Sequence, residues 1–239
     1  SNCPTILGKK KHRSVGFATE LLLSFLLHMT PIPKEELEVF KGLKDIKVVF
    51  DVGCRTDTDY YDLRPNLEYH LFEPNPEFYK QIKINPNTVI NNFGLGDKEE
   101  YAQYYPAVQS FSDVSWRGNG GEFYHIKTLN SYGKIPDFLK IDTEGYDYKV
   151  LLGADNILSK VKYIQFEYWD GVAKFVELLK DYNLYLIREP RLLEAIRMVT
   201  QDTKYNLLLC PVTQDVVDLI DNKLIPAYGA GGNILAIRK

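Results

Sequence analysis

The sequence of 239 residues has few cysteines, no long apolar run and no excess of basic residues. Its three cysteines, Cys3, Cys54 and Cys210, are odd in number and widely spaced. This spacing excludes a disulfide framework and a cysteine-based zinc site, and it predicts a reducing, cytoplasmic location. The most apolar stretch, residues 18–29, is interrupted by polar residues and is too short to span a membrane. A net charge of −3 argues against nucleic-acid binding through bulk charge.

What the chain does contain is the composition of a globular domain, with 45% hydrophobic and 26% charged residues. A chain of this length buries a sizeable core without a metal or disulfide. Residues 18–29 and 34–43 have the pattern of helices, and two prolines separate them. We therefore predict a helical N-terminal extension over residues 1–45 and a main domain over residues 46–239. Because the first residue is Ser rather than Met, one domain of a larger polypeptide is a further hypothesis.

From residue 47 onward, short apolar runs alternate with helical patterns. Strands are predicted over residues 48–50, 69–72, 88–91, 138–141, 163–166 and 184–187, and helices over residues 76–84, 147–158 and 171–181. This alternation is typical of βαβ units and predicts a doubly wound, Rossmann-like α/β fold. Residues 206–210 and 233–237 are both candidates for the strand that closes the sheet.

An acidic residue follows nearly every predicted strand: Asp51, Glu73, Asp97, Asp142 and Glu167. In parallel sheets, ligands bind beyond the carboxyl ends of the strands. Gly53 permits a tight turn and a close approach of the backbone to a ligand. Glu73 lies twenty residues after Gly53, where an acid accepts hydrogen bonds from both hydroxyls of a ribose.

Five segments carry a more specific signal, in this order: Val49–Gly53, His70–Asn75, Asn92–Asp97, Lys127–Leu129 and Leu139–Gly145. With these segments the sequence resembles the FkbM-type methyltransferases, a branch of the class I methyltransferases that use S-adenosylmethionine (SAM). The resemblance covers roughly half of the chain. It implies a seven-stranded sheet with an antiparallel last strand, SAM as methyl donor and a hydroxyl group as the usual acceptor.

The resemblance also assigns the cofactor contacts: Asp51 and Gly53 at the methionine end of SAM, Glu73 and Pro74 at its ribose, Leu95 and Asp97 at its adenine, and Asp142 where it meets the acceptor. One position departs from the family, because Asp57 replaces a glycine of the loop after Gly53. Arg55 could pair with Asp57 or bind the carboxylate of SAM, and both interpretations stay open. Asp57 or Asp59 could instead cap the next helix.

Four residues are candidates for accepting the proton of the acceptor hydroxyl: Asp142, Glu144, Glu167 and His125. Asp142 and Glu144 could instead cap the following helix, and His125 could equally be exposed to solvent. A second possibility is a divalent cation such as Mg²⁺, held by Asp142, Glu167 and Asp170.

The sequence thus favours a SAM-dependent O-methyltransferase that acts on a hydroxyl of a sugar, a glycan or a similar small polyhydroxylated acceptor. One alternative is a binding module that keeps the fold but has lost activity, because the glycine loop is altered. Another is a metal-dependent glycosyltransferase that uses Asp57 and Asp59. The expected partner is a small-molecule or glycan acceptor, with no nucleic acid and no membrane span.

Overall fold

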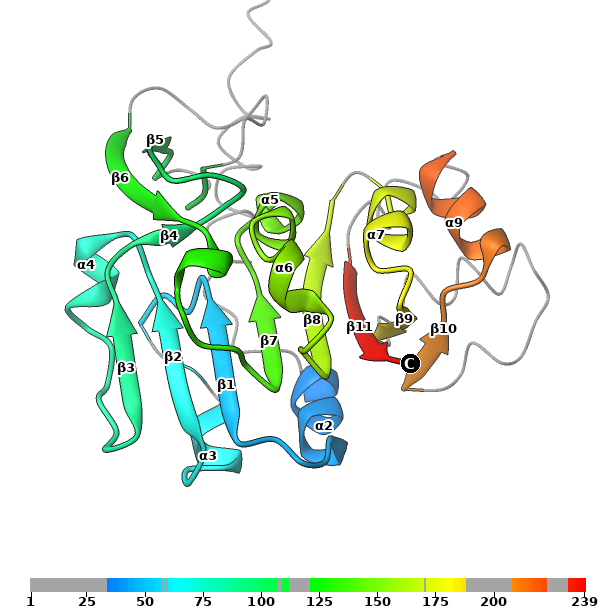
Figure 1. Cartoon of the computed structure of the whole chain (residues 1–239), viewed down its shortest axis with the longest axis horizontal. Coiled ribbons are helices and arrows are strands. Elements are labelled where there is room, and N and C mark those ends of the chain that lie inside the picture. The colour runs from blue at the N-terminus through cyan, green and yellow to red at the C-terminus, as the bar shows by residue number, and fades with distance from the viewer. Residues whose placement is uncertain are drawn as a thin grey trace, which may run out of the picture. The chain divides into compact units, whose positions relative to one another are not determined.

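The protein is described by a computed structural model over residues 34–56, 58, 60–106, 109–111, 121–169, 171–187, 208–222 and 232–239. In this part of the chain the main sheet has eight strands in the order β10-β9-β11-β8-β7-β1-β2-β3 (Figure 1). Their bounds are Val48–Val52 (β1), Glu68–Phe72 (β2), Thr88–Asn91 (β3), Phe138–Ile141 (β7), Tyr163–Tyr168 (β8), Tyr182–Ile187 (β9), Leu209–Pro211 (β10) and Gly232–Arg238 (β11). All six strands predicted from the apolar runs are present.

The pairing confirms the doubly wound fold. Strands β3, β2, β1, β7 and β8 are parallel neighbours, and β11 is antiparallel to both β8 and β9. Strand β10 pairs antiparallel with β9 at the edge. Both candidate closing segments therefore join the sheet, which gives one strand more than the seven predicted.

The described helices are α2 (Lys34–Gly42), α3 (Tyr60–Leu63), α4 (Pro76–Tyr79), α5 (Asp147–Leu152), α6 (Asp155–Leu158), α7 (Ala173–Leu178) and α9 (Gln214–Asp221), with a 3-10 turn η1 at Leu129–Ser131. The single helix predicted over residues 147–158 is divided into α5 and α6. A Cβ at Gly153 would lie 1.8 Å from the carbonyl oxygen of Gly96, so the backbone passes Gly96 at close range. At α4, Asn75 caps the first turn and Pro76 opens it, as helix starts favour.

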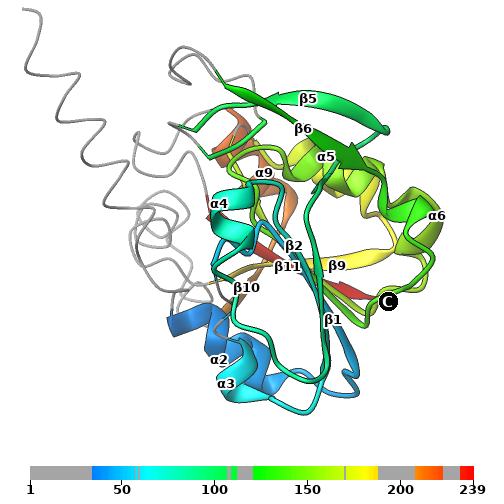
Figure 2. The same ribbon diagram turned by 90° about the vertical axis from the view of Figure 1, so that its left-hand side faces the viewer.

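The two faces of the sheet are covered by different helices (Figure 2). Alternate strand residues such as Phe50, Leu139 and Phe166 belong to the main apolar cluster, together with buried residues of α5, α6, α7 and α9. The opposite face carries α2 and α3, where the Phe40 ring lies 4.5 Å from Tyr60 and 5.0 Å from Phe138. This second face also buries polar side chains, which are described below.

A second, three-stranded sheet was not predicted. It has the order β4-β6-β5, formed by Gly94–Leu95, Glu122–Lys127 and Glu100–Tyr104. Its strands β5 and β6 pair antiparallel, and each has exposed residues that mask the alternation in the sequence. Leu95 and Ile126 join it to the main core.

Several sequence-based predictions concern residues outside the described part of the chain: the helix over residues 18–29, and Asp57, Asp59 and Asp170. Helix α2, which falls within the predicted extension, packs on the sheet, and the boundary at residue 45 stays a prediction. None of the described helices has the length and apolar character needed to cross a membrane.

Candidate cofactor and acceptor site

The carboxyl ends of four central strands meet at one edge of the sheet. The amide of Gly53 donates to Phe72 O at 3.0 Å and the amide of Asp142 donates to Val52 O at 2.9 Å, so the chain stays in register just past the strands. Glu167 lies in β8, one residue beyond the Ile141–Phe166 pair that aligns β7 with β8. Glu73 and Asp142 follow their strands as predicted, whereas Asp51 lies within β1 and Glu167 within β8.

Gly53 fixes the turn after β1. Its φ is +83°, and a Cβ at this position would lie 1.9 Å from the carbonyl oxygen of Asp142. Only glycine satisfies both conditions, because other residues resist positive φ and carry that Cβ. The turn brings the loop after β1 directly against the end of β7.

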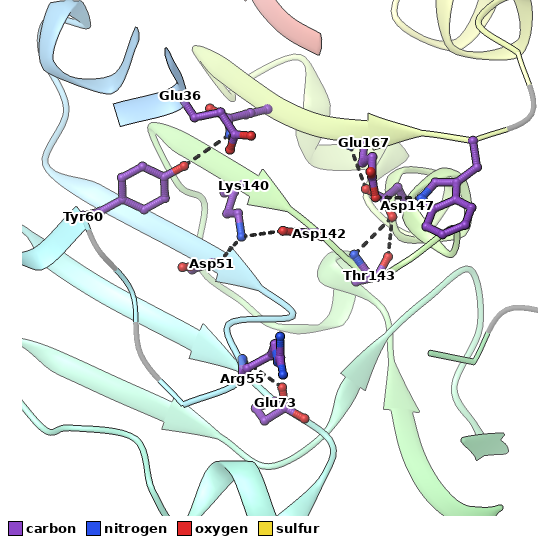
Figure 3. Close-up of polar contacts among 12 residues, drawn as sticks. Glu36, Asp51, Arg55, Tyr60, Glu73, Lys140, Asp142, Thr143, Asp147 and Glu167 are labelled. Atoms are coloured by element: carbon purple, nitrogen blue, oxygen red, sulfur yellow. Dashed lines mark hydrogen bonds and ion pairs between the residues drawn. The ribbon is translucent and has the colours of Figure 1, made fainter. Parts of the chain in front are cut away.

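Glu73, directly after β2, is buried with 3% of its surface exposed. Its Oε2 accepts from the amide of Arg55 at 3.0 Å (Figure 3), and its Oε1 accepts from the amide of Asn75 at 2.8 Å. Burial raises its pKa to about 7, although the two amide hydrogen bonds act in the opposite direction. A carboxylate has about four acceptor positions, so two remain for the hydroxyls of a ribose. These two acceptor positions fit the hydroxyl donors of the ribose of SAM.

Arg55 adopts a left-handed backbone with φ +58°, and its guanidinium lies 5.3 Å from the centroid of the Phe78 ring. Its amide thus serves Glu73 while its side chain extends over α4. Pro74 is half-buried, and its carbonyl accepts from Asn92 Nδ2 at 3.1 Å. Binding of the SAM carboxylate by Arg55 stays a prediction.

The two residues predicted at adenine differ in their exposure to solvent. Leu95 is buried in β4 and belongs to the main core, whereas Asp97 is exposed two residues later. Gly96 between them donates to Lys127 O at 2.9 Å. Their contact with adenine stays a prediction.

Lys140 of β7 connects two of the predicted site residues, and sequence reasoning gave it no role. Its Nζ lies 3.5 Å from Asp51 Oδ1 and 3.2 Å from Asp142 Oδ2 (Figure 3). Burial alone would lower the pKa of Lys140, but the carboxylates of Asp142 and Asp51 hold it well above its usual range. A signal was available, because a lysine and an aspartate each interrupt a short apolar strand and the two strands are neighbours.

A second acidic group forms where β7, α5 and β8 meet. Glu167 Oε2 accepts from Trp169 Nε1 at 2.6 Å, and the amide of Glu167 donates to Asp147 Oδ1 at 2.9 Å. Burial raises the pKa of Glu167 well above its usual range, and the charges of Asp142, Glu144 and Asp147 add to this effect. A carboxylate whose surroundings favour its protonated form is a stronger base than an ordinary carboxylate. Glu144, at the turn, has a left-handed φ of +53°.

Asp147 joins the ends of β7 and β8, and sequence reasoning did not single it out. Its Oδ2 accepts from the amide and the hydroxyl of Thr143 at 3.2 and 2.6 Å. We expect Asp147→Ala to lower the free energy of unfolding by about 2 kcal/mol, because buried donors lose their partner. Asp155→Ala is the matched control, because Asp155 accepts from Asn130 Nδ2 in an exposed position on α6. Urea unfolding of both variants tests this, and equal losses would contradict it.

A buried polar group also lies under α2, where Glu36 accepts from Gln165 Nε2 (Figure 3). The same nitrogen lies 3.2 Å from Tyr60 Oη. Burial raises the pKa of Glu36 to about 7 from an ordinary value of 4.5, opposed by Lys140 and aided by Asp142. Helix α2 therefore places a carboxyl group close to the charges at the strand ends.

The raised pKa of Glu36 predicts a loss of stability with rising pH. The folded state holds this proton up to about pH 7 and the unfolded chain releases it near pH 4.5. The stabilisation is therefore complete below the lower value and lost as pH rises through the upper one. When the pH is raised from 5 to 8, the free energy of unfolding should fall in the wild type. We expect this fall to be about 2 kcal/mol smaller in Glu36→Gln, which has no carboxyl group to titrate.

The control for this measurement is Glu38→Gln, because Glu38 lies on the same helix with 43% of its side chain exposed. Urea unfolding at the two pH values should give Glu38→Gln the slope of the wild type. If Glu36→Gln also had the slope of the wild type, the fall in stability with rising pH could not be assigned to Glu36.

His125 of β6 lies apart from these acids. Its Nε2 lies 3.1 Å from Glu99 Oε1, and its ring stacks on Tyr101 at 5.0 Å. By strand alternation it points away from the face on which its neighbour Ile126 is buried. Over the described residues, no group of three or more His, Cys, Asp or Glu is placed to hold a metal ion. The predicted cation site of Asp142, Glu167 and Asp170 stays a prediction, because Asp170 lies outside the described residues.

The sheet order, the glycine turn after β1 and the acids at the strand ends define a Rossmann-like methyltransferase fold. The family model for the methyltransferase FkbM domain matches residues 51–189, more than half of the chain. The chain belongs to this family, which confirms the resemblance seen in the sequence.

The chain is 28% identical over 174 residues to the hexuronic acid methyltransferase AglP of Haloferax volcanii. The match spans 66% of this chain and 66% of that relative. Among solved structures, the methyltransferase FkbM of Methylobacillus flagellatus is similar with a TM-score of 0.44 and 14% identity, over 72% of this chain and 52% of that one. A TehB-like SAM-dependent methyltransferase of Corynebacterium glutamicum has a TM-score of 0.43 and 9% identity, over 93% and 96% of the two chains.

Proposed function

We propose that this protein is a SAM-dependent O-methyltransferase that acts on a hydroxyl group of a sugar or a similar polyhydroxylated acceptor. The observation that carries the proposal is the shared strand edge. There the buried carboxylate of Glu73 keeps two acceptor positions, and Glu167 with its raised pKa stands among other acids. Membership of the FkbM family supports SAM as the cofactor.

When bound, SAM supplies an activated methyl group on a sulfonium centre. In this proposal Glu73 binds the ribose and so orients the cofactor along the strand edge. Glu167 or Asp142 accepts the proton of the attacking hydroxyl. A raised pKa suits Glu167 for this step, because a carboxylate of ordinary pKa is a weak base.

A sugar acceptor is supported by the name of the relative from Haloferax volcanii, a hexuronic acid methyltransferase. It agrees with the polyhydroxylated acceptor expected from the sequence. The oxygen that receives the methyl group belongs to the proposal, since the match does not distinguish one acceptor atom from another.

The proposal is tested by titrating the chain with S-adenosylhomocysteine (SAH) and by incubating it with labelled SAM and a panel of hexuronic acids and neutral sugars. We expect SAH binding and a labelled sugar, whose methylated atom is identified by NMR. An absence of SAH binding would overturn the proposal. SAH binding without transfer to any sugar would favour a binding module, and binding of a nucleotide sugar with Mn²⁺ in place of SAH would favour a glycosyltransferase.

A further inference from the structure

Lys140 is the only lysine or arginine that is buried in the part of the chain described here. It lies in β7, opposite Asp51 of β1 and Gln165 of β8 in the strand register. Burying an ammonium group is costly unless charged partners compensate it. A lysine at the centre of a sheet therefore needs a reason beyond packing.

The two carboxylates that contact Lys140 differ in their freedom. The side chain of Asp51 is 1% exposed, whereas that of Asp142 is 43% exposed at the strand edge. An ammonium group has three donors and can serve both partners at once. Asp51 thus provides a fixed contact inside the sheet, and Asp142 is the partner that could move.

Asp142 and Lys140 lie among several other ionisable side chains. Asp142 acts electrostatically on four other carboxyl groups, those of Glu36, Asp51, Asp147 and Glu167. The groups that act on Lys140 are Asp142 and Asp51, Tyr60 of α3 and Glu36 of α2. Without the ammonium group, the half-exposed carboxylate of Asp142 would lose its ion pair of 3.2 Å and be free to turn toward solvent.

We propose that Lys140 is a positioning residue, whose ammonium group holds the carboxylate of Asp142 at the edge where cofactor and acceptor meet. This inference rests on the proposed function, because it assigns Asp142 to the methyl-transfer site. Lys140 acts through Asp142, since its side chain is enclosed between β1, β8 and the residues of α2 and α3.

The experiment compares Lys140→Met, Asp142→Asn and the double variant with the wild type. Lys162→Met is the matched control, because Lys162 forms an ion pair of 3.1 Å with Asp137, which directly precedes the same strand. Lys140→Arg keeps the positive charge that Lys140→Met removes. If Lys140→Met does not fold, Lys140→Met combined with Asp51→Asn removes both buried charges and takes its place in the hydrogen-exchange measurement alone, because Asp51 is assigned to the cofactor site.

Kinetics should show that Lys140→Met lowers kcat about 30-fold and leaves KM for the acceptor within about threefold, as expected for a displaced catalytic contact. The double variant should be within about threefold of Asp142→Asn, because two residues that act through one contact are not additive. Lys140→Arg should recover part of kcat, and Lys162→Met should match the wild type. Fully additive losses, or a kcat for Lys140→Met equal to that of the control, would overturn the inference.

A second measurement needs neither ligand nor activity. Hydrogen exchange of the free protein should be about tenfold faster across residues 141–145 in Lys140→Met than in Lys162→Met, because the turn loses its anchor. Equal exchange in the two variants would overturn the inference. A wild-type chain that binds no SAH would instead overturn the proposed function, so the two failures are distinguishable.

Discussion

Glu73→Gln should weaken SAH binding on the order of 100-fold, because two hydrogen bonds from ribose hydroxyls to a buried carboxylate are each worth about 1.5 kcal/mol or more. The carboxylate of Glu73 is already oriented by the amides of Arg55 and Asn75. A glutamine has one acceptor oxygen, so its NH₂ group would face one of these amide donors. The substitution therefore disturbs both the ligand contact and its support.

The matched control is Glu77→Gln, because the exposed Glu77 side chain lies four residues away on α4 and pairs with Lys80 at 3.1 Å. Isothermal titration with SAH should show an unchanged affinity for this control. Thermal unfolding should show that Glu73→Gln is still folded. A Glu73→Gln variant with wild-type affinity would remove Glu73 from the cofactor site.

The same titration has a predicted pH dependence. The pKa of Glu73 is raised to about 7 by burial, and the charged form is the better acceptor for two hydroxyl donors. SAH affinity of the wild type should therefore rise as pH increases through about 7 and then level off. Glu73→Gln should lose this rise, and a rise that persists in the variant would assign it to another group.

Gly53→Ala should lower the free energy of unfolding by about 4 kcal/mol, or prevent folding, because positive φ and overpacking add their costs. The φ of Gly53 is +83° and its Cβ would meet Asp142 O at 1.9 Å. The neighbouring atom is backbone of a central strand end, so it cannot give way as a flexible side chain would.

Gly133→Ala separates these two costs. Gly133 has nearly the same φ, +81°, but nothing lies within 4 Å of its Cβ position. We expect its loss to be about 1 kcal/mol, which is the backbone contribution alone. Urea unfolding of both variants measures the difference, and equal losses would show that the contact between Gly53 and Asp142 carries no energetic weight.

The local sequence was sufficient for the parallel core. Strands β1, β2, β7 and β8 follow apolar runs that are buried from both faces, so each run is a strong signal. The small sheet of β4, β5 and β6 escaped prediction because its strands are partly exposed. The sequence predicts a single helix where the structure has α5 and α6. The close contact of Gly153 with Gly96 depends on residues far apart in the chain, so no local pattern marks it.

The sequence by itself determined the doubly wound fold, the edge of the sheet at which the acids gather, and the family. Strand periodicity and strand-end motifs are local patterns, and the topology of parallel sheets brings strand ends together. Only the tertiary structure decided which side chains meet there. Lys140 between Asp51 and Asp142, and Glu36 against Gln165, depend on strand register and helix docking. Contacts across such distances in sequence are set by packing, which no local pattern records.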